Sequence, residues 1–224
     1  MESVARGLLP FRDVIGNVAG ILTVAQFLSG CFVCNQIRLK QSSEGFSPLS
    51  FVLGGALASL QLKYSQMLGL KAMILTTCYS LAICLVYAGW YWLYIPRGKA
   101  GNFWKLVLRT ITVVSAVLLY AGLEDPVVVR DRFGLIVTVL TLGYIGLPLM
   151  KLGVVIERKS CEGLPLPGIL ASTGASILWL LYGVILHNYF IIIQKVIALG
   201  LCTIQLSLFV IYPAPSKAVK AKSK

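Results

Sequence analysis

The chain has 224 residues, of which 58% are hydrophobic and only 12% are charged, so it lacks the polar surface of a water-soluble globular protein. Its 20 Lys and Arg against 8 Asp and Glu give a net charge of +12. The basic residues stand singly between long apolar runs, which argues against a nucleic-acid-binding patch and for a membrane protein whose positive charges report its topology.

Runs without a charged residue locate the predicted membrane-spanning helices, because a charge at the bilayer centre costs about 3 kcal/mol or more. In chain order these runs are residues 14–37, 45–62, 72–96, 110–123, 133–150, 163–194 and 196–216. The fourth run is shorter than a span of about 20 residues and needs Phe103 and Trp104 to complete one. The last two runs are better divided at the polar pair His187 and Asn188, which predicts helices near 164–186 and 189–212 with Lys195 inside the second. The chain is therefore predicted to have seven transmembrane helices.

The distribution of Lys and Arg predicts the orientation, because positively charged loops stay cytoplasmic. Twelve of the 20 basic residues lie on one side of the seven-helix arrangement, including those of the tail 217–224. We therefore expect a multi-pass membrane protein with its N-terminus outside and its C-terminus in the cytosol. Residues 220–224 match a Lys-x-Lys-x-x retrieval signal, which leaves the plasma membrane and the Golgi or endoplasmic reticulum open as locations.

The chain matches itself at an offset of 118 residues, as transporters built from duplicated helical units do. Ser42-Ser43-Glu44-Gly45 aligns with Ser160-Cys161-Glu162-Gly163, and Tyr64 aligns with Tyr182. A single helix lies between the two matching triplets, so both triplets have the same orientation. We predict an all-α membrane protein with two parallel triple-helix bundles joined by a linker helix (3+1+3). The predicted segments are 1–96 for the first bundle, 97–127 for the linker helix, 128–212 for the second bundle and 213–224 for a basic cytosolic tail.

This pattern resembles the SWEET sugar transporters of the MtN3/saliva type. The Ser-x-Glu-Gly loops and the segments 178–183 and 205–213 carry the resemblance, which is strongest over residues 143–213. The stretches 147–149, 159–167 and 179–183 look like an insect member. The resemblance implies a facilitative, bidirectional uniporter that moves mono- or disaccharides by alternating access of the two bundles. It implies no cofactor and no enzymatic activity. The expected partners are the sugar and the lipid bilayer, no nucleic-acid partner is expected, and self-association into a homo-oligomer is left open.

The resemblance also assigns candidate residues. In the family each bundle supplies a Trp and an Asn to the substrate site. The substrate-binding positions are Trp179, Gln61, Thr77 and Lys195, the hinge positions are Pro148, Pro165, Pro48 and Gly30, and the extracellular gate is Tyr64 with Asn188. Of the four binding positions, only Trp179 keeps the residue typical of the family. The hinge position of Pro48 lies one residue out of register with Pro165.

Simpler interpretations stand beside these assignments. Lys195 lies close enough to the predicted outer end of its helix to snorkel, Trp179 is also typical of a packing aromatic, and a Pro that starts a helix needs no hinge. Because three of the four binding positions depart from the family, the alternative function is a non-transporting scaffold or interaction protein that keeps the fold. One His and no carboxylate inside an apolar run argue against a metal site or a hydrolytic triad.

Overall fold

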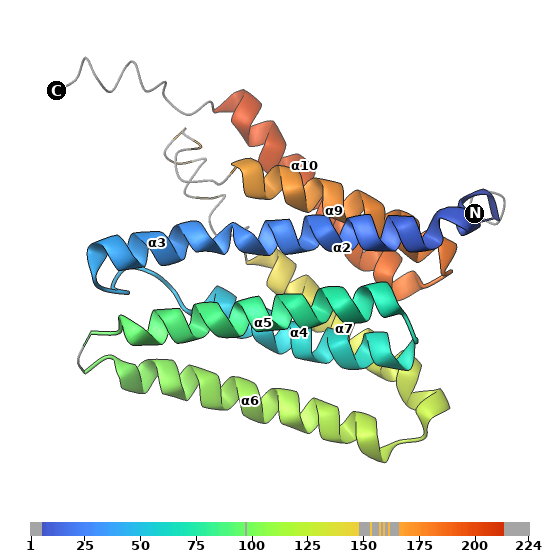
Figure 1. Cartoon of the computed structure of the whole chain (residues 1–224), viewed down its shortest axis with the longest axis horizontal. Coiled ribbons are helices and arrows are strands. Elements are labelled where there is room, and N and C mark those ends of the chain that lie inside the picture. The colour runs from blue at the N-terminus through green and yellow to red at the C-terminus, as the bar shows by residue number, and fades with distance from the viewer. Residues whose placement is uncertain are drawn as a thin grey trace.

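A computed structural model describes residues 6–96, 98–147 and 166–212 and the single residues 153, 157, 159 and 161. Every regular element among these residues is a helix (Figure 1). In chain order the elements are η1 (Leu9–Phe11), α2 (Arg12–Leu28), α3 (Gly30–Lys40), α4 (Leu49–Met67), α5 (Lys71–Leu93), α6 (Ala100–Leu123), α7 (Pro126–Gly146), α9 (Leu166–Ile185) and α10 (Tyr189–Ile211). The protein is therefore all-α, as predicted.

The helices have the lengths that a bilayer requires. At about 1.5 Å per residue, the 23 residues of α5 and of α10 reach across the hydrocarbon core. Five described segments are long and apolar enough to cross a membrane on their own: Arg6–Lys40, α5, α6, α9 and α10. Helices α4 and α7 have 19 and 21 residues but are more polar, since α4 contains Lys63 and the first two turns of α7 carry Arg130, Asp131 and Arg132.

The predicted helix boundaries are close to the observed ones. Helix α9 ends at Ile185 and α10 begins at Tyr189, so the polar pair predicted to divide them lies in the turn. The linker helix α6 starts at Ala100 and includes the two aromatic residues expected to complete it, Phe103 and Trp104. Helix α7 starts at Pro126, inside the predicted linker range, because the Asp125 side chain accepts a hydrogen bond from the Val127 amide and caps the helix there.

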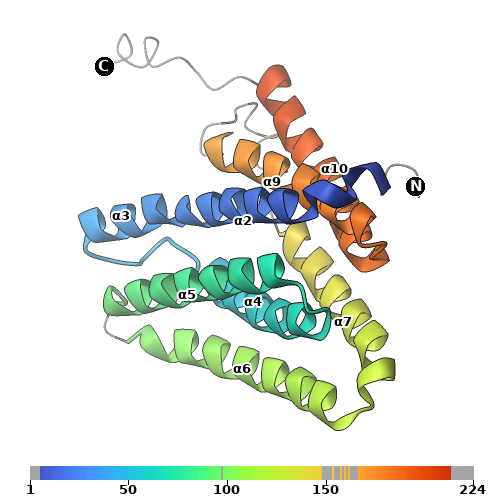
Figure 2. The same cartoon turned by 45° about the vertical axis from the view of Figure 1, so that its right-hand side comes forward.

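In the part of the chain that the structure describes, six spans form a ring and a seventh lies outside it. Helix α5 packs against both α2 and α4, and α10 packs against both α7 and α9, so the third helix of each triplet lies between the other two. The triplets meet through contacts of α2 with α9 and of α4 with α7, which close the ring. Helix α6 packs against α4 and α7 on the outside, as Figures 1 and 2 show.

The two triplets have matching helix bounds. Helix α10 begins and ends 118 residues after α5, and α9 and α7 end 118 residues after α4 and α2. The second residues of the two Ser-x-Glu-Gly sequences, Ser43 and Cys161, make equivalent hydrogen bonds. The Ser43 amide donates to the Tyr94 carbonyl at 2.9 Å, and the Cys161 amide, 118 residues later, donates to the Tyr212 carbonyl at 3.2 Å. Each loop is thus tied to the end of the third helix of its own triplet.

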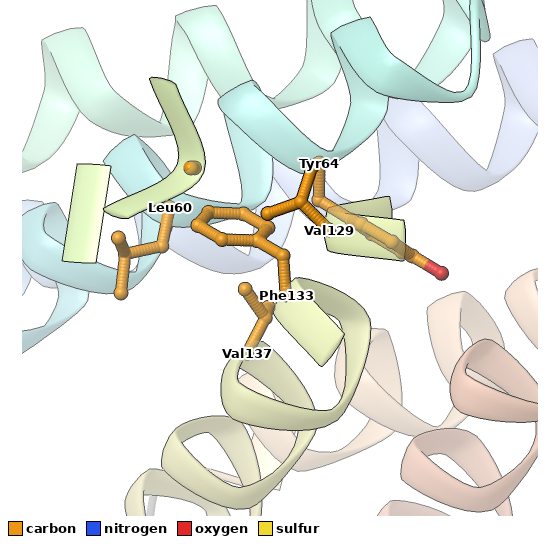
Figure 3. Close-up of a cluster of buried hydrophobic side chains, with 6 residues drawn as sticks. Leu60, Tyr64, Val129, Phe133 and Val137 are labelled. Atoms are coloured by element: carbon orange, nitrogen blue, oxygen red, sulfur yellow. The ribbon is translucent and has the colours of Figure 1, made fainter. Parts of the chain in front are cut away.

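A cluster of buried apolar side chains holds α4, α6 and α7 together at the predicted external end. It consists of Leu60, Tyr64, Ala121, Val129, Phe133 and Val137, and Figure 3 shows the Phe133 ring among its neighbours. A second cluster joins α2 to α9 through Ala19, Ala175, Trp179 and Tyr182. Both clusters cross the boundary between the triplets, so apolar packing holds the triplets together there.

Candidate functional site

A cavity of about 190 Å³ lies between the two triplets. Its 24 lining residues come from α2, α4, α5, α7, α9 and α10, twelve from each triplet. Eleven of the twelve lining residues of the first triplet have a counterpart 118 positions later that lines the cavity from the second triplet. Thr77 and Lys195 are one such pair. Tyr64 and Val137 have no counterpart in the lining. The cavity therefore lies on the axis that relates the triplets.

The four predicted binding positions all line this cavity. Gln61 comes from α4, Thr77 from α5, Trp179 from α9 and Lys195 from α10. They are dispersed over 134 residues of sequence, and the ring of helices brings them into one space. Their position makes them available to a solute, and their role in binding stays a prediction.

Trp179 and Gln61 make equivalent hydrogen bonds across the boundary between the triplets. The Trp179 indole Nε1 donates to Thr23 Oγ1 at 2.8 Å, and the Gln61 amide Nε2 donates to Thr141 Oγ1 at 3.3 Å. The two donors are 118 residues apart from each other, and so are the two acceptors. Gln61 therefore replaces the aromatic surface expected at its position but keeps an N–H donor in the same place. Sequence reasoning missed this, although threonine at both 23 and 141 is a visible signal.

The walls of the cavity carry hydroxyl and amide groups. The polar lining residues other than Lys195 are Thr23, Gln26, Gln61, Thr76, Thr77, Ser80, Thr141, Ser172, Ser176, Gln194 and the Tyr64 and Tyr144 hydroxyls. Thr76, Thr77 and Ser80 donate their protons to carbonyls of their own helix, at 2.7 to 2.9 Å. Their oxygens keep lone pairs that can accept hydrogen bonds from a solute.

Among the described residues that line the cavity, Lys195 is the one cation, and none is a carboxylate. Within the described ranges its ammonium has neither a hydrogen bond nor an ion pair, and the one titratable group near enough to interact with it is the Cys202 thiol. Thr77, its counterpart on the opposite wall, is 6% exposed. The charge distribution of the cavity is therefore asymmetric, although its lining residues occur in pairs 118 positions apart.

The two predicted gate residues are in contact. Asn188 Nδ2 lies 3.0 Å from Tyr64 Oη, and Asn188 Oδ1 accepts from the Ile191 amide at 3.1 Å. Asn188 thus caps α10 and joins it to α4 of the other triplet, where the Phe190 ring also meets Tyr64 edge-on at 6.4 Å. The contact lies at the end that the charge pattern predicts to be external.

Two glycines that sequence reasoning missed allow each triplet to approach the other. A Cβ placed at Gly134 would lie 3.0 Å from the Tyr64 ring, and one at Gly16 would lie 2.8 Å from the Tyr182 ring. Both glycines and both tyrosines are 118 residues apart. Each tyrosine of a second helix therefore packs on a glycine in the first helix of the opposite triplet. A pair of glycines at the repeat offset was the signal available in the sequence.

The structure describes two of the four predicted hinge residues. Gly30 follows directly after Ser29, at which the first span is interrupted between α2 and α3. The Tyr87 hydroxyl donates to the Phe27 carbonyl at 3.1 Å beside this interruption, and a Cβ at Gly30 would lie 2.4 Å from the Tyr87 ring. Pro48 is the N-cap residue of α4 and lies before its first turn, in a place where a proline starts a helix. Pro148 and Pro165 lie outside the described residues.

At the predicted cytosolic end, Tyr144 of α7 reaches α4. Its hydroxyl lies 3.3 Å from the Ser50 carbonyl and donates to it. In the adjoining loop the Lys99 ammonium donates a hydrogen bond to Glu44, and this bond with the charge attraction lowers the pKa of the Glu44 carboxyl. Both side chains of this pair are exposed, so it contributes little stability.

Comparison with known proteins identifies the family. The family described as "Sugar efflux transporter for intercellular exchange" (MtN3/saliva) matches residues 13–99 and again residues 131–217. Sugar transporter SWEET1 of Drosophila pseudoobscura pseudoobscura is 31% identical, with 91% of each chain covered. Sugar transporter SWEET1 of Caenorhabditis elegans is 30% identical over 90% of this chain and 66% of its own length. The solved structure of a eukaryotic SWEET transporter has a TM-score of 0.80 at 22% identity, covering 90% of this chain and 96% of that chain. The chain belongs to the MtN3/SWEET family and has its 3+1+3 fold.

Proposed function

We propose that this protein is a facilitative sugar transporter that works in both directions as a uniporter. The observation that carries the proposal is the cavity on the axis between the triplets, which combines an indole with hydroxyl and amide groups. A sugar ring presents C–H surface that stacks on an aromatic face and hydroxyls that exchange hydrogen bonds. The names of the relatives, sugar transporters of fly and nematode, agree with this chemistry.

The size of the cavity favours a monosaccharide over a disaccharide in this conformation. A buried cavity of about 150 Å³ holds one benzene ring, so about 190 Å³ accommodates one six-membered ring with its substituents rather than two. Trp179 on α9 supplies the apolar surface, and Gln61 and Thr77 supply polar contacts from the opposite triplet. No cofactor is needed for this chemistry, because the sugar moves down its own gradient.

The way in which the triplets meet is the basis for proposing alternating access. The triplets contact each other through the pairs α2 with α9 and α4 with α7, and the Asn188–Tyr64 bond joins them at the predicted external end. Opening that end requires the triplets to tilt apart. Helix α2 ends at Leu28, two residues before Gly30, and α7 ends at Gly146, two residues before Pro148, so we place the bending points there. Pro48 and Pro165 are proposed to complete the set at the starts of α4 and α9.

The orientation and location are proposals from the charge pattern. We place the N-terminus outside and the C-terminus in the cytosol, with residues 1–96, 97–127 and 128–212 as first bundle, linker and second bundle. The plasma membrane is the expected location, and the Lys-x-Lys-x-x end of the tail offers retrieval to the Golgi or endoplasmic reticulum as the second. The tail, residues 213–224, lies outside the described residues.

Counterflow of radiolabelled glucose into proteoliposomes tests the function. The parent protein should exchange glucose above empty liposomes, and Trp179→Ala should lower the rate at least about tenfold, since it removes the stacking surface and a cross-triplet hydrogen bond. Trp92→Ala is the matched control, because Trp92 is 48% exposed and does not line the cavity. A folded parent without flux for any sugar would favour the scaffold function instead.

A further inference from the structure

The unpaired ammonium of Lys195 is a feature that transport of a neutral sugar leaves unexplained. Lys195 is partly buried on α10 and lines the cavity, whereas the neighbouring Val196 and Ile193 are 53% and 47% exposed on the surface that faces lipid. Its side chain therefore contributes to the cavity wall. Each of the described acidic residues lies away from the cavity lining, so no group of the described protein neutralises this charge.

The charge and the indole of the cavity lie on the same side. Lys195 and Trp179 belong to α10 and α9, which pack against each other in the second triplet. The equivalent positions in the first triplet hold the neutral residues Thr77 and Gln61. A solute with an anionic group next to a ring would find both of its partners on one wall and polar groups on the other.

We propose that Lys195 selects sugars that carry one carboxylate, the uronic-acid class, over neutral sugars of the same size. This inference rests on the proposed sugar transport. An ammonium donates three hydrogen bonds and accepts none, so a carboxylate is its natural partner in a space that lacks one. A charge without a counter-ion in a membrane interior is unfavourable, and an anionic solute removes that penalty on entering.

The single charge of Lys195 also limits which class of anionic sugar the site can bind. A sugar phosphate carries about −1.5 to −2 charges near pH 7, so one ammonium would leave part of that charge without a partner. Among the described lining residues no second cation is present to complete the pair. A monoanion fits the site, and a dianion does not.

Counterflow of glucose and of glucuronate by the same proteoliposomes tests the inference. The parent should exchange glucuronate at a lower half-saturating concentration than glucose. Lys195→Gln keeps a polar side chain of similar reach without the charge. It should raise the half-saturating concentration of glucuronate about tenfold or more, and by a larger factor than that of glucose. Lys195→Arg should restore most of the preference for glucuronate. Lys63→Gln is the matched control, because Lys63 on α4 does not line the cavity.

A binding measurement separates this inference from the proposed function. Purified parent protein should show a larger rise in unfolding temperature with glucuronate than with glucose, and Lys195→Gln should abolish the difference. Glucose exchange without preference for glucuronate overturns the role of Lys195 and leaves sugar transport standing. Glucuronate binding that depends on Lys195 without any flux overturns transport and supports the anion site. Absence of both flux and Lys195-dependent binding overturns both.

Discussion

The contact between Asn188 and Tyr64 predicts how firmly the external end is closed. Asn188→Ser keeps a capping oxygen for the Ile191 amide but is too short to reach the Tyr64 hydroxyl, which Asn188 now meets at 3.0 Å. Tyr64→Phe removes the same bond from the other side. A neutral hydrogen bond contributes about 1 kcal/mol, so each substitution should shift the closed-to-open equilibrium about fivefold toward the open state.

A labelling assay measures this shift. A cysteine introduced at Ala175, which is buried in the cavity wall at 3% exposure, would react with a membrane-impermeant thiol reagent only when the external end opens. The native cysteines are replaced first, because Cys31 and Cys78 are exposed. Each single variant should be labelled about fivefold faster than the parent, and the double variant no faster than either one, because all three lack the same bond.

Tyr182→Phe provides the matched control. Tyr182 is the residue equivalent to Tyr64, and its neighbour Leu70, at the position equivalent to Asn188, has no polar side-chain atom. Its substitution should leave the labelling rate near that of the parent. The effects of Asn188→Ser and Tyr64→Phe on the labelling rate could instead multiply in the double variant. That result would show that the two side chains act independently, so their hydrogen bond would not be the closing contact.

Three further predictions concern other parts of the structure. Gly30→Ala should lower the unfolding temperature by an amount equivalent to about 1–3 kcal/mol, because the added Cβ meets an aromatic ring at 2.4 Å, whereas Gly89→Ala, in open space, should not. Gln61→Leu should slow glucose counterflow, while Gln61→Trp, which keeps an N–H donor at that position, should retain it; equal loss in both would contradict the hydrogen-bond role. The lowered pKa of Glu44 stabilises the folded state above the ordinary carboxyl value of 4.5, and this contribution is lost as the pH falls through the folded pKa. Because the pair is exposed, Glu44→Gln should flatten the dependence of unfolding temperature on pH in that acidic range only slightly, and a steeper dependence in the variant than in the parent would contradict the predicted sign.

The helices and their order could be predicted from the sequence because charges mark the ends of membrane spans. The turn at His187 and Asn188 is an example, since α9 and α10 stop and start around it. The offset of 118 residues was also visible in the sequence, and it places Thr77 opposite Lys195 in the cavity lining. The turn and the offset are both defined by where residues stand along the chain, and the sequence gives this information directly.

The contacts across the triplet boundary could not be predicted in the same way. Transmembrane helices are apolar on nearly all faces, so hydrophobic periodicity does not show which face meets a neighbour and which meets lipid. The packing of Tyr64 on Gly134 and the hydrogen bond of Gln61 to Thr141 depend on that choice. From the sequence Gln61 was a departure from the family, and only the three-dimensional arrangement shows that it keeps a donor for α7.

In the proposed mechanism the solute crosses the membrane through the cavity between the triplets. Ser176→Trp tests it most directly, because Ser176 lines the cavity at 6% exposure and an indole there would fill much of the space of about 190 Å³. Ile177→Trp places the same side chain on the neighbouring residue, which is 46% exposed and outside the lining. In proteoliposomes with equal amounts of folded protein, glucose counterflow should disappear for Ser176→Trp and persist for Ile177→Trp. Counterflow at the parent rate by folded Ser176→Trp would contradict the account.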